Sequence, residues 1–335
     1  MRKKAWGLLM VVCMVLVVPN VFYAVDQNEM FDEEFSVDSD GAQLYLRVRG
    51  QDMNNPVLLY LHGGPGDLTG PLYFQAYAGP LLEKRFTVGY LHQRGTCKSP
   101  SVPPEMLTVE NFIKDVDNVV SFLKKEFRKD RVFLIGHSFG GILGYLYLLE
   151  HGADVEKFVS AGGAFSTILI EEHGYQTVLE LAQKAGDLEA VKKMESLGPP
   201  PYKTFQEGMA WRTLGMTLLA KANESPLDLS QISKVASVTG AVRIDEWMGK
   251  SMTLANAMWK ELATVDVEDE VKNITTPLLI ITGAKDLFVP FQLLKKGYEN
   301  YGGEKEYCIL EKGSHNMFVD EPDLFVSKVI EFFQK

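Results

Sequence analysis

The chain has 335 residues, of which 46% are hydrophobic and 23% are charged, and its formal net charge is −10. These values exclude a fibrous or disordered chain and allow one large folded domain with an insertion. An acidic chain in which no clustered Lys and Arg stand out as a phosphate-binding surface also argues against nucleic acid as a partner.

The first 24 residues have the order of segments found in export signals. Arg2, Lys3 and Lys4 precede an apolar run over residues 5–18, and a short segment ending at Ala24 follows. We therefore expect export, to a secreted or periplasmic location, with cleavage after Ala24. An uncleaved membrane anchor is the alternative, and residues 5–24 are the only part for which we expect membrane association.

Strand patterns begin after this segment. Residues 35–50 are typical of a hairpin around a turn-rich cluster, Asp-Ser-Asp-Gly. Continuous apolar runs over residues 56–61 and 86–91 are typical of strands buried on both faces of a sheet. The first run ends at His-Gly-Gly-Pro-Gly (residues 62–66) and the second at His-Gln-Arg-Gly (residues 92–95).

Helices and strands then alternate along the chain. Apolar positions recur every three or four residues over 108–127, which predicts an amphipathic helix. Further strands are predicted at residues 131–135, 157–161, 277–283 and 306–311. Alternation of this kind implies an α/β fold with a doubly wound, mostly parallel sheet that carries helices on both faces.

One long stretch interrupts this alternation. Between residues 165 and 275 the buried-strand runs disappear and helical periodicity replaces them. We interpret it as a helical cap, inserted after the sixth strand, that covers the ends of the strands. The predicted division is therefore an export segment or anchor (1–24), a core (25–164 and 276–335) and a cap (165–275).

A sharp turn after the 131–135 strand carries a candidate nucleophile. The turn is Gly136-His137-Ser138-Phe139-Gly140, followed directly by an apolar run with helical spacing. A side chain at either glycine would collide with the neighbouring strand or helix, so only glycine suits these two positions. The pattern predicts that Ser138 is a nucleophile whose hydroxyl is exposed to substrate.

A serine nucleophile needs a histidine base and an acid that orients it. Of six histidines, only His315 follows the last predicted strand in a glycine-containing loop. His137 is the rival, but its backbone lies too close to Ser138 for the right approach. Asp286 follows the penultimate strand and is the predicted acid; Asp320 is the alternative, expected in solvent. The order Ser138, Asp286, His315 is the one expected on this kind of sheet.

The tetrahedral oxyanion formed by such a serine needs hydrogen-bond donors. The backbone N–H groups of Gly64, preferred to Gly63, and of Phe139 are the predicted oxyanion hole. The glycine-rich loop lacks the Lys-Ser/Thr of a phosphate-binding loop, and no dinucleotide fingerprint or His/Cys/Asp ligand cluster is present in the sequence. We therefore expect no cofactor and no metal.

Together these motifs resemble the α/β-hydrolase fold and, within it, the prolyl aminopeptidase (proline iminopeptidase) group. His-Gly-Gly-Pro-Gly followed by Gln-Arg-Gly is fairly specific to that group, whereas many esterases, lipases and peptidases share the serine turn. The chain departs from the group at His92, where Asp is usual, and at Phe139, where Trp is common.

The resemblance implies that acidic cap residues hold the α-ammonium group of a peptide substrate. Glu171, Glu172, Glu207 and Trp211 are the residues available, although no Glu follows Trp211 as it does in the group. The predicted function is a serine hydrolase that releases an N-terminal proline or apolar residue from a small peptide. Hydrolysis of small or medium carboxylic esters is one alternative, and a non-catalytic binding protein on the same scaffold is another. The oligomeric state stays open.

Overall fold

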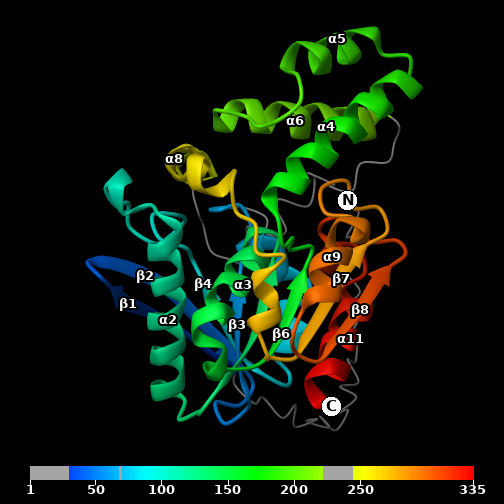
Figure 1. The fold of residues 1–335 in the computed structure, drawn as a ribbon. Helices are drawn as coiled ribbons and strands as arrows, with labels where there is room; N and C mark the ends of the chain where they lie inside the picture. Colours follow the sequence, from blue (N-terminus) through cyan, green and yellow to red (C-terminus); the bar gives the residue numbers. More distant parts are fainter. Residues whose placement is uncertain (1–29, 68–69, 222–243) are drawn as a thin grey trace, which may run out of the picture.

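A computed structural model describes residues 30–67, 70–221 and 244–335 (Figure 1). The predicted export segment, residues 1–24, lies outside the described residues. Within the described ranges, no helix has the length and apolar character needed to cross a bilayer. An eight-stranded sheet forms the centre, with helices on both faces and further helices beyond one end of its strands (Figure 1).

The sheet confirms the predicted doubly wound, mostly parallel architecture. Its strand order is β1-β2-β4-β3-β5-β6-β7-β8. β1 pairs with β2, and β2 with β4, in antiparallel register, whereas every later pair is parallel. The strands are β1 (Phe31–Ser39), β2 (Ala42–Gly50), β3 (Val57–Leu61), β4 (Thr87–Leu91), β5 (Val132–His137), β6 (Val155–Ala161), β7 (Leu278–Gly283) and β8 (Lys305–Leu310).

The two faces of the sheet carry separate apolar cores, as expected of strands buried on both sides. Leu59 and Leu61 of β3 pack in the core under α2, α3 and α9, whereas Leu58 and Tyr60 pack in the core under α1 and α11. The core helices are α1 (Gly79–Leu82), α2 (Val109–Glu126), α3 (Phe139–His151), α9 (Lys295–Asn300), α10 (Met317–Asp320) and α11 (Pro322–Gln334). Short helical turns are η1 (Gly70–Phe74), η2 (Pro104–Met106), η3 (Gly152–Asp154), η5 (Glu270–Asn273) and η6 (Phe291–Leu294).

The helix predicted over residues 108–127 is α2. Its N-cap is Thr108, whose hydroxyl accepts a hydrogen bond from the Asn111 N–H at 3.2 Å. Its apolar side chains, spaced at three and four, are buried against the sheet: Phe112, Val116, Val119, Val120 and Leu123.

The cap follows the sixth strand, as predicted, and consists of helices. Figure 1 shows them above the sheet, with the chain entering from β6 and returning to β7. The two ends of the insertion lie side by side: the Thr167 N–H donates to the Val265 carbonyl at 2.9 Å, and the Val267 N–H donates to the Phe165 carbonyl at 2.8 Å. The described cap helices are α4 (Thr167–Lys184), α5 (Leu188–Leu197), α6 (Phe205–Lys221) and α8 (Ile244–Leu262).

Candidate active site

Ser138 lies on a strained turn between β5 and α3. Its backbone has φ 54° and ψ −119°, a conformation that L residues rarely adopt. A Cβ atom at Gly136 would overlap the Gly140 carbonyl, and one at Gly140 would overlap the carbonyl of Leu61 in β3. Only glycine fits on either side, which is the reason inferred from the sequence.

The predicted base and acid are hydrogen-bonded to each other. His315 Nδ1 lies 2.8 Å from Asp286 Oδ2. Because an ionised carboxylate only accepts hydrogen bonds, Nδ1 carries the proton and Nε2 is left unprotonated. The other carboxylate oxygen, Oδ1, accepts from the N–H groups of Phe288 (2.8 Å) and Val289 (2.9 Å), which fix its orientation. His315 and Ser138 line the same cavity.

The electrostatics of this pair suit a general base. Burial alone would lower the pKa of His315, but the negative charge and hydrogen bond of Asp286 outweigh it and raise the pKa above 6.5. Burial alone would raise the pKa of Asp286, yet the His315 charge and the hydrogen bonds that the carboxylate accepts hold it below 3.8. Asp286 is therefore ionised at neutral pH.

His137 and Asp320, the alternatives to His315 and Asp286, form hydrogen bonds that stabilise the loop around His315 instead. His137 Nε2 lies 2.9 Å from the His315 carbonyl, and burial followed by the His315 charge lowers the pKa of His137 to about 4. Asp320 Oδ2 accepts from both the N–H and the hydroxyl of Ser314, each at 2.6 Å. The expectation that Asp320 is merely in solvent was wrong, because it fixes the residue before His315.

The glycine-rich loop after β3 is held by Gln93, which the sequence singled out only through the family motif. The Gln93 amide donates to the His62 carbonyl at 2.7 Å and accepts from the Gly66 N–H at 2.8 Å. Gly64 has φ 112°, which favours glycine. Gly64 and Phe139, the predicted oxyanion donors, both line the cavity with Ser138.

Arg94, the next residue of the same motif, has a structural role. It is fully buried, and its guanidinium donates to Asp115 Oδ2 at 2.9 Å and to Asp115 Oδ1 at 2.6 Å. It also donates to the Ser39 carbonyl at 3.3 Å. Arg94 thus joins the loop after β4 to α2 and to the β1–β2 hairpin.

A cavity of about 490 Å³ lies between the core loops and the cap. Most of its wall is apolar, with contributions from Ile142, Ile170, Met209, Trp259 and Phe288. Among the described residues, those in the wall that are charged or titratable are Asp67, Glu171, Arg212 and His315. A concave, mainly apolar site with a few polar groups is typical of small-molecule binding.

Of the four predicted cap residues, Glu171 is the one that lines the cavity, and it is already partnered. Its carboxylate accepts from the Arg212 guanidinium at 2.5 and 3.1 Å and from Trp211 Nε1 at 2.8 Å. The Trp211 ring is buried beside it and is not part of the cavity wall. Arg212 was not predicted, because nothing in the sequence indicates that α4 and α6 bring these two charges together.

The other two predicted glutamates lie away from the cavity. Glu172 is exposed, since successive residues of a helix point in different directions and Glu171 points inward. Glu207 Oε2 accepts from the N–H groups of Lys203 (2.7 Å) and Thr204 (3.1 Å), and the Thr204 hydroxyl accepts from the Glu207 N–H at 3.2 Å. This reciprocal arrangement is a capping box at the start of α6.

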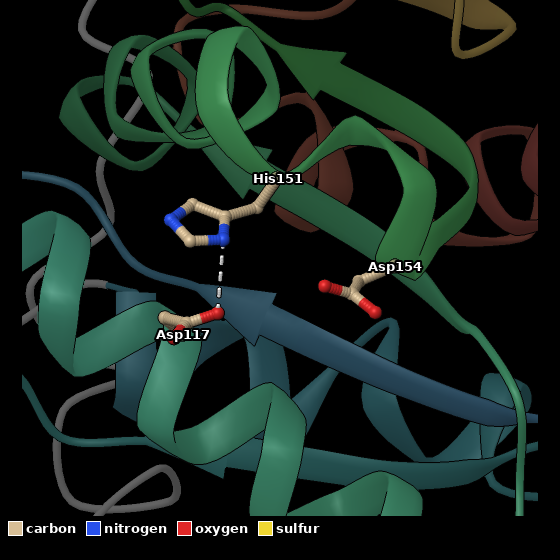
Figure 2. Close-up of side chains that lie close together, drawn as sticks. All are labelled: Asp117, His151 and Asp154. Carbon is tan, nitrogen blue, oxygen red and sulfur yellow. Dashed lines mark ion pairs between the residues drawn. The ribbon is translucent and has the colours of Figure 1, made fainter.

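One group among the described residues has the composition and spacing of a possible metal site (Figure 2). Asp117, His151 and Asp154 place one ligand atom each within 4.8 Å of the others. His151 Nδ1 lies 3.1 Å from Asp117, however, and Asp154 forms an ion pair with Lys124. None of these side chains lines the cavity. We interpret the cluster as ion pairs that join α2 to the end of α3 and to η3.

Comparison with known proteins agrees with this geometry. Residues 57–323 match the family described as serine aminopeptidase, S33. The probable aminopeptidase YbaC of Bacillus subtilis is 27% identical over 84% of this chain and 90% of its own length. The proline iminopeptidase of Thermoplasma volcanium is 28% identical over 90% of this chain and 97% of its own length.

Solved structures show the same fold. An esterase from Exiguobacterium antarcticum superposes with a TM-score of 0.60 at 20% identity, covering 90% of this chain and 100% of the esterase. The family match spans well over half of the chain, and the sheet has the strand order and turn described above. The chain therefore belongs to the serine aminopeptidase family S33 and is an α/β-hydrolase enzyme.

Proposed function

We propose that this enzyme is a serine hydrolase acting by acyl transfer, and that it is an aminopeptidase releasing an N-terminal proline or apolar residue. One observation carries the proposal. Ser138, on its strained turn, shares a cavity with His315, whose Nδ1 is hydrogen-bonded to Asp286 at 2.8 Å. A serine beside a histidine that is paired with a carboxylate is the set of groups by which a serine hydroxyl is activated.

In the proposed reaction, Ser138 Oγ attacks the carbonyl carbon of the scissile bond while His315 Nε2 takes its proton. Asp286 holds the Nδ1–H and stabilises the imidazolium that forms. The N–H groups of Gly64 and Phe139 receive the oxyanion. His315 then protonates the leaving amine, and water, activated by the same histidine, releases the acid and restores Ser138.

The aminopeptidase specificity is supported by the relatives and by the cavity. The two curated relatives are named as a probable aminopeptidase and a proline iminopeptidase. Apolar walls such as Ile170, Met209 and Trp259 suit a proline or another apolar first residue. The cavity also contains carboxylates, which a free N-terminal amine requires.

One observation favours ester hydrolysis as a second candidate. Glu171, the cap carboxylate in the cavity wall, is neutralised by Arg212, so the cap presents a balanced ion pair. An apolar wall with a balanced pair also suits an uncharged acyl group, and the esterase from Exiguobacterium antarcticum shares the fold.

Two measurements test the proposal. A fluorophosphonate probe should label the wild-type protein at Ser138 and should not label Ser138→Ala. Turnover of proline 4-nitroanilide should exceed that of the Ser138→Ala control by orders of magnitude. Ester turnover with no anilide turnover would favour the second candidate, and a wild-type protein that does not react with the probe would contradict acyl transfer.

We also propose that residues 1–24 direct export, on the basis of their basic and apolar segments alone. Mass spectrometry of protein recovered outside the cytoplasm should find Val25 as the first residue. An intact N-terminus in the membrane fraction would indicate the anchor instead.

A further inference from the structure

We infer that Asp67, at the end of the glycine-rich loop after β3 and not in the cap, receives the α-ammonium group of the substrate's first residue. This inference rests on the proposed function and adds the residue that would distinguish a free amine from an uncharged acyl group. Three features of the cavity support it.

The first feature is position. The Asp67 N–H donates to the Gly63 carbonyl at 3.2 Å, which closes the loop that contains Gly64, and Asp67 lines the cavity with Ser138. A Cβ atom placed on Gly63 would lie 3.0 Å from Ser138 Cβ and 3.4 Å from Asp67 Oδ2. Ser138 Cβ and the Asp67 carboxylate therefore lie close to the same point beside Gly63, where His137 Nδ1 would also be 3.3 Å away.

The second feature is the geometry of an aminoacyl group. Only Cα separates its ammonium nitrogen from the carbonyl carbon, so the two atoms are about 2.5 Å apart. When the carbonyl carbon is bonded to Ser138 and its oxygen faces the Gly64 N–H, the ammonium must stay near the same loop. A carboxylate on that loop can therefore contact the ammonium group without spanning the cavity.

The third feature is the distribution of charge. Glu171 accepts hydrogen bonds from Arg212 and Trp211, so an ammonium group there would compete with a guanidinium that is already bound. Asp67 acts electrostatically on the catalytic centre: burial lowers the pKa of His315, Asp286 raises it, and Asp67 raises it further. The negative charge of Asp67 therefore acts at the place where the substrate would react.

The test compares two substrates that differ only in the α-amino group, leucine 4-nitroanilide and 4-methylpentanoyl 4-nitroanilide. The wild-type enzyme should prefer the leucine compound. Asp67→Asn should lower kcat/KM for the leucine compound by about 10- to 100-fold, which is the size expected for a lost hydrogen bond to a charged group. For the des-amino compound the loss should be less than about 2-fold. The control Glu172→Gln, an exposed position outside the cavity, should change neither value.

Several results would overturn the inference. Equal losses on both anilides would mean that Asp67 acts through His315 or the loop fold, and no loss on either would mean that it does not meet the substrate. A wild-type enzyme that prefers the des-amino compound, or cleaves neither anilide, would also overturn it. In all these cases fluorophosphonate labelling of Ser138 would leave acyl transfer intact, whereas loss of wild-type labelling would remove the proposed function as well.

A second measurement covers the case in which Asp67→Asn fails to fold and is not labelled. The preference of the wild-type enzyme for leucine 4-nitroanilide should fall about tenfold per pH unit above the pKa of the substrate amine, which is about 8. Asp67→Glu, which keeps the charge, should retain part of that preference. A preference that does not change with pH would overturn the inference.

Discussion

The core and the cap contribute to the same cavity in different ways. In the core, the loops at the ends of the strands are fixed by contacts such as Gln93 with residues 62–66 and His137 with His315. In the cap, Glu171 and Arg212 link two helices, and the neighbouring wall is apolar. The candidate reacting groups thus lie on loops at the strand ends, whereas the cap adds helix side chains to the wall of the same cavity.

The two regions are nevertheless in contact at the glycine-rich loop after β3. Trp247 Nε1 in α8 donates to the Gly66 carbonyl at 3.3 Å, and the Ser251 hydroxyl donates to the same oxygen. Movement of α8 would therefore reach the loop that carries Gly64. Substitutions in the core and in the cap test whether the proposed reaction and the substrate preference can be altered separately.

The largest effect is expected from Ser138→Ala in the core. Removal of the nucleophile should lower kcat by about 10³- to 10⁶-fold, because only binding and the oxyanion donors remain. Ser36→Ala, in the exposed hairpin, is the matched control and should keep full activity. Substantial activity in Ser138→Ala would mean that the nucleophile lies elsewhere.

Asp286→Asn should lower kcat/KM by about 10³- to 10⁴-fold. It also tests the pKa of His315. Activity requires neutral Nε2, so wild-type kcat/KM should rise with pH through a pKa above 6.5, and loss of the Asp286 charge should move that rise to lower pH. A pH–rate profile with the same midpoint in both proteins would contradict the assignment.

Arg94→Met should lower the free energy of unfolding more than it lowers catalytic activity. It leaves the buried Asp115 carboxylate without its cation, which costs about 3–5 kcal/mol in the free energy of unfolding. Chemical denaturation would measure the loss. Lys114→Met, in an exposed ion pair with Glu110 on the same helix, should leave the midpoint unchanged. Similar midpoints for both variants would show that the motif residue has no structural role.

Arg212→Met should alter substrate preference and leave Ser138 reactive. Without the guanidinium, the Glu171 charge is no longer balanced and the cavity becomes more negative. The ratio of kcat/KM for leucine 4-nitroanilide to that for its des-amino analogue should rise by up to about 10-fold. Arg212→Lys should stay close to wild type. If Arg212→Met abolished fluorophosphonate labelling, the cap would be part of the catalytic machinery.

Glu207→Ala should have the smallest effect. Loss of the capping box should cost about 0.5–1 kcal/mol in unfolding free energy, with no change in the ratio of the two anilides. A changed ratio would mean that Glu207 contacts substrate, as the family resemblance implied.

Much of the core could be predicted from the sequence because its signals are local. Apolar runs predict the strands, and glycines two residues either side of Ser138 predict the turn. Asp286 and His315 follow the last two strands, and the carboxyl ends of parallel strands meet at one edge of a sheet. The capping role of Glu207 also has a local signal, because Thr204 precedes it by three residues.

Contacts between distant segments could not be predicted in this way. Glu171 and Arg212 are 41 positions apart on two helices, and their pairing depends on how those helices rotate and pack. The same holds for Asp67, whose nearness to Ser138 follows from the pairing of β3 with β5. Local patterns in the sequence were enough to predict the order of the elements and the candidate reacting groups. Which charges in the cavity are balanced depends on side-chain directions, and these follow only from the packing of the folded chain.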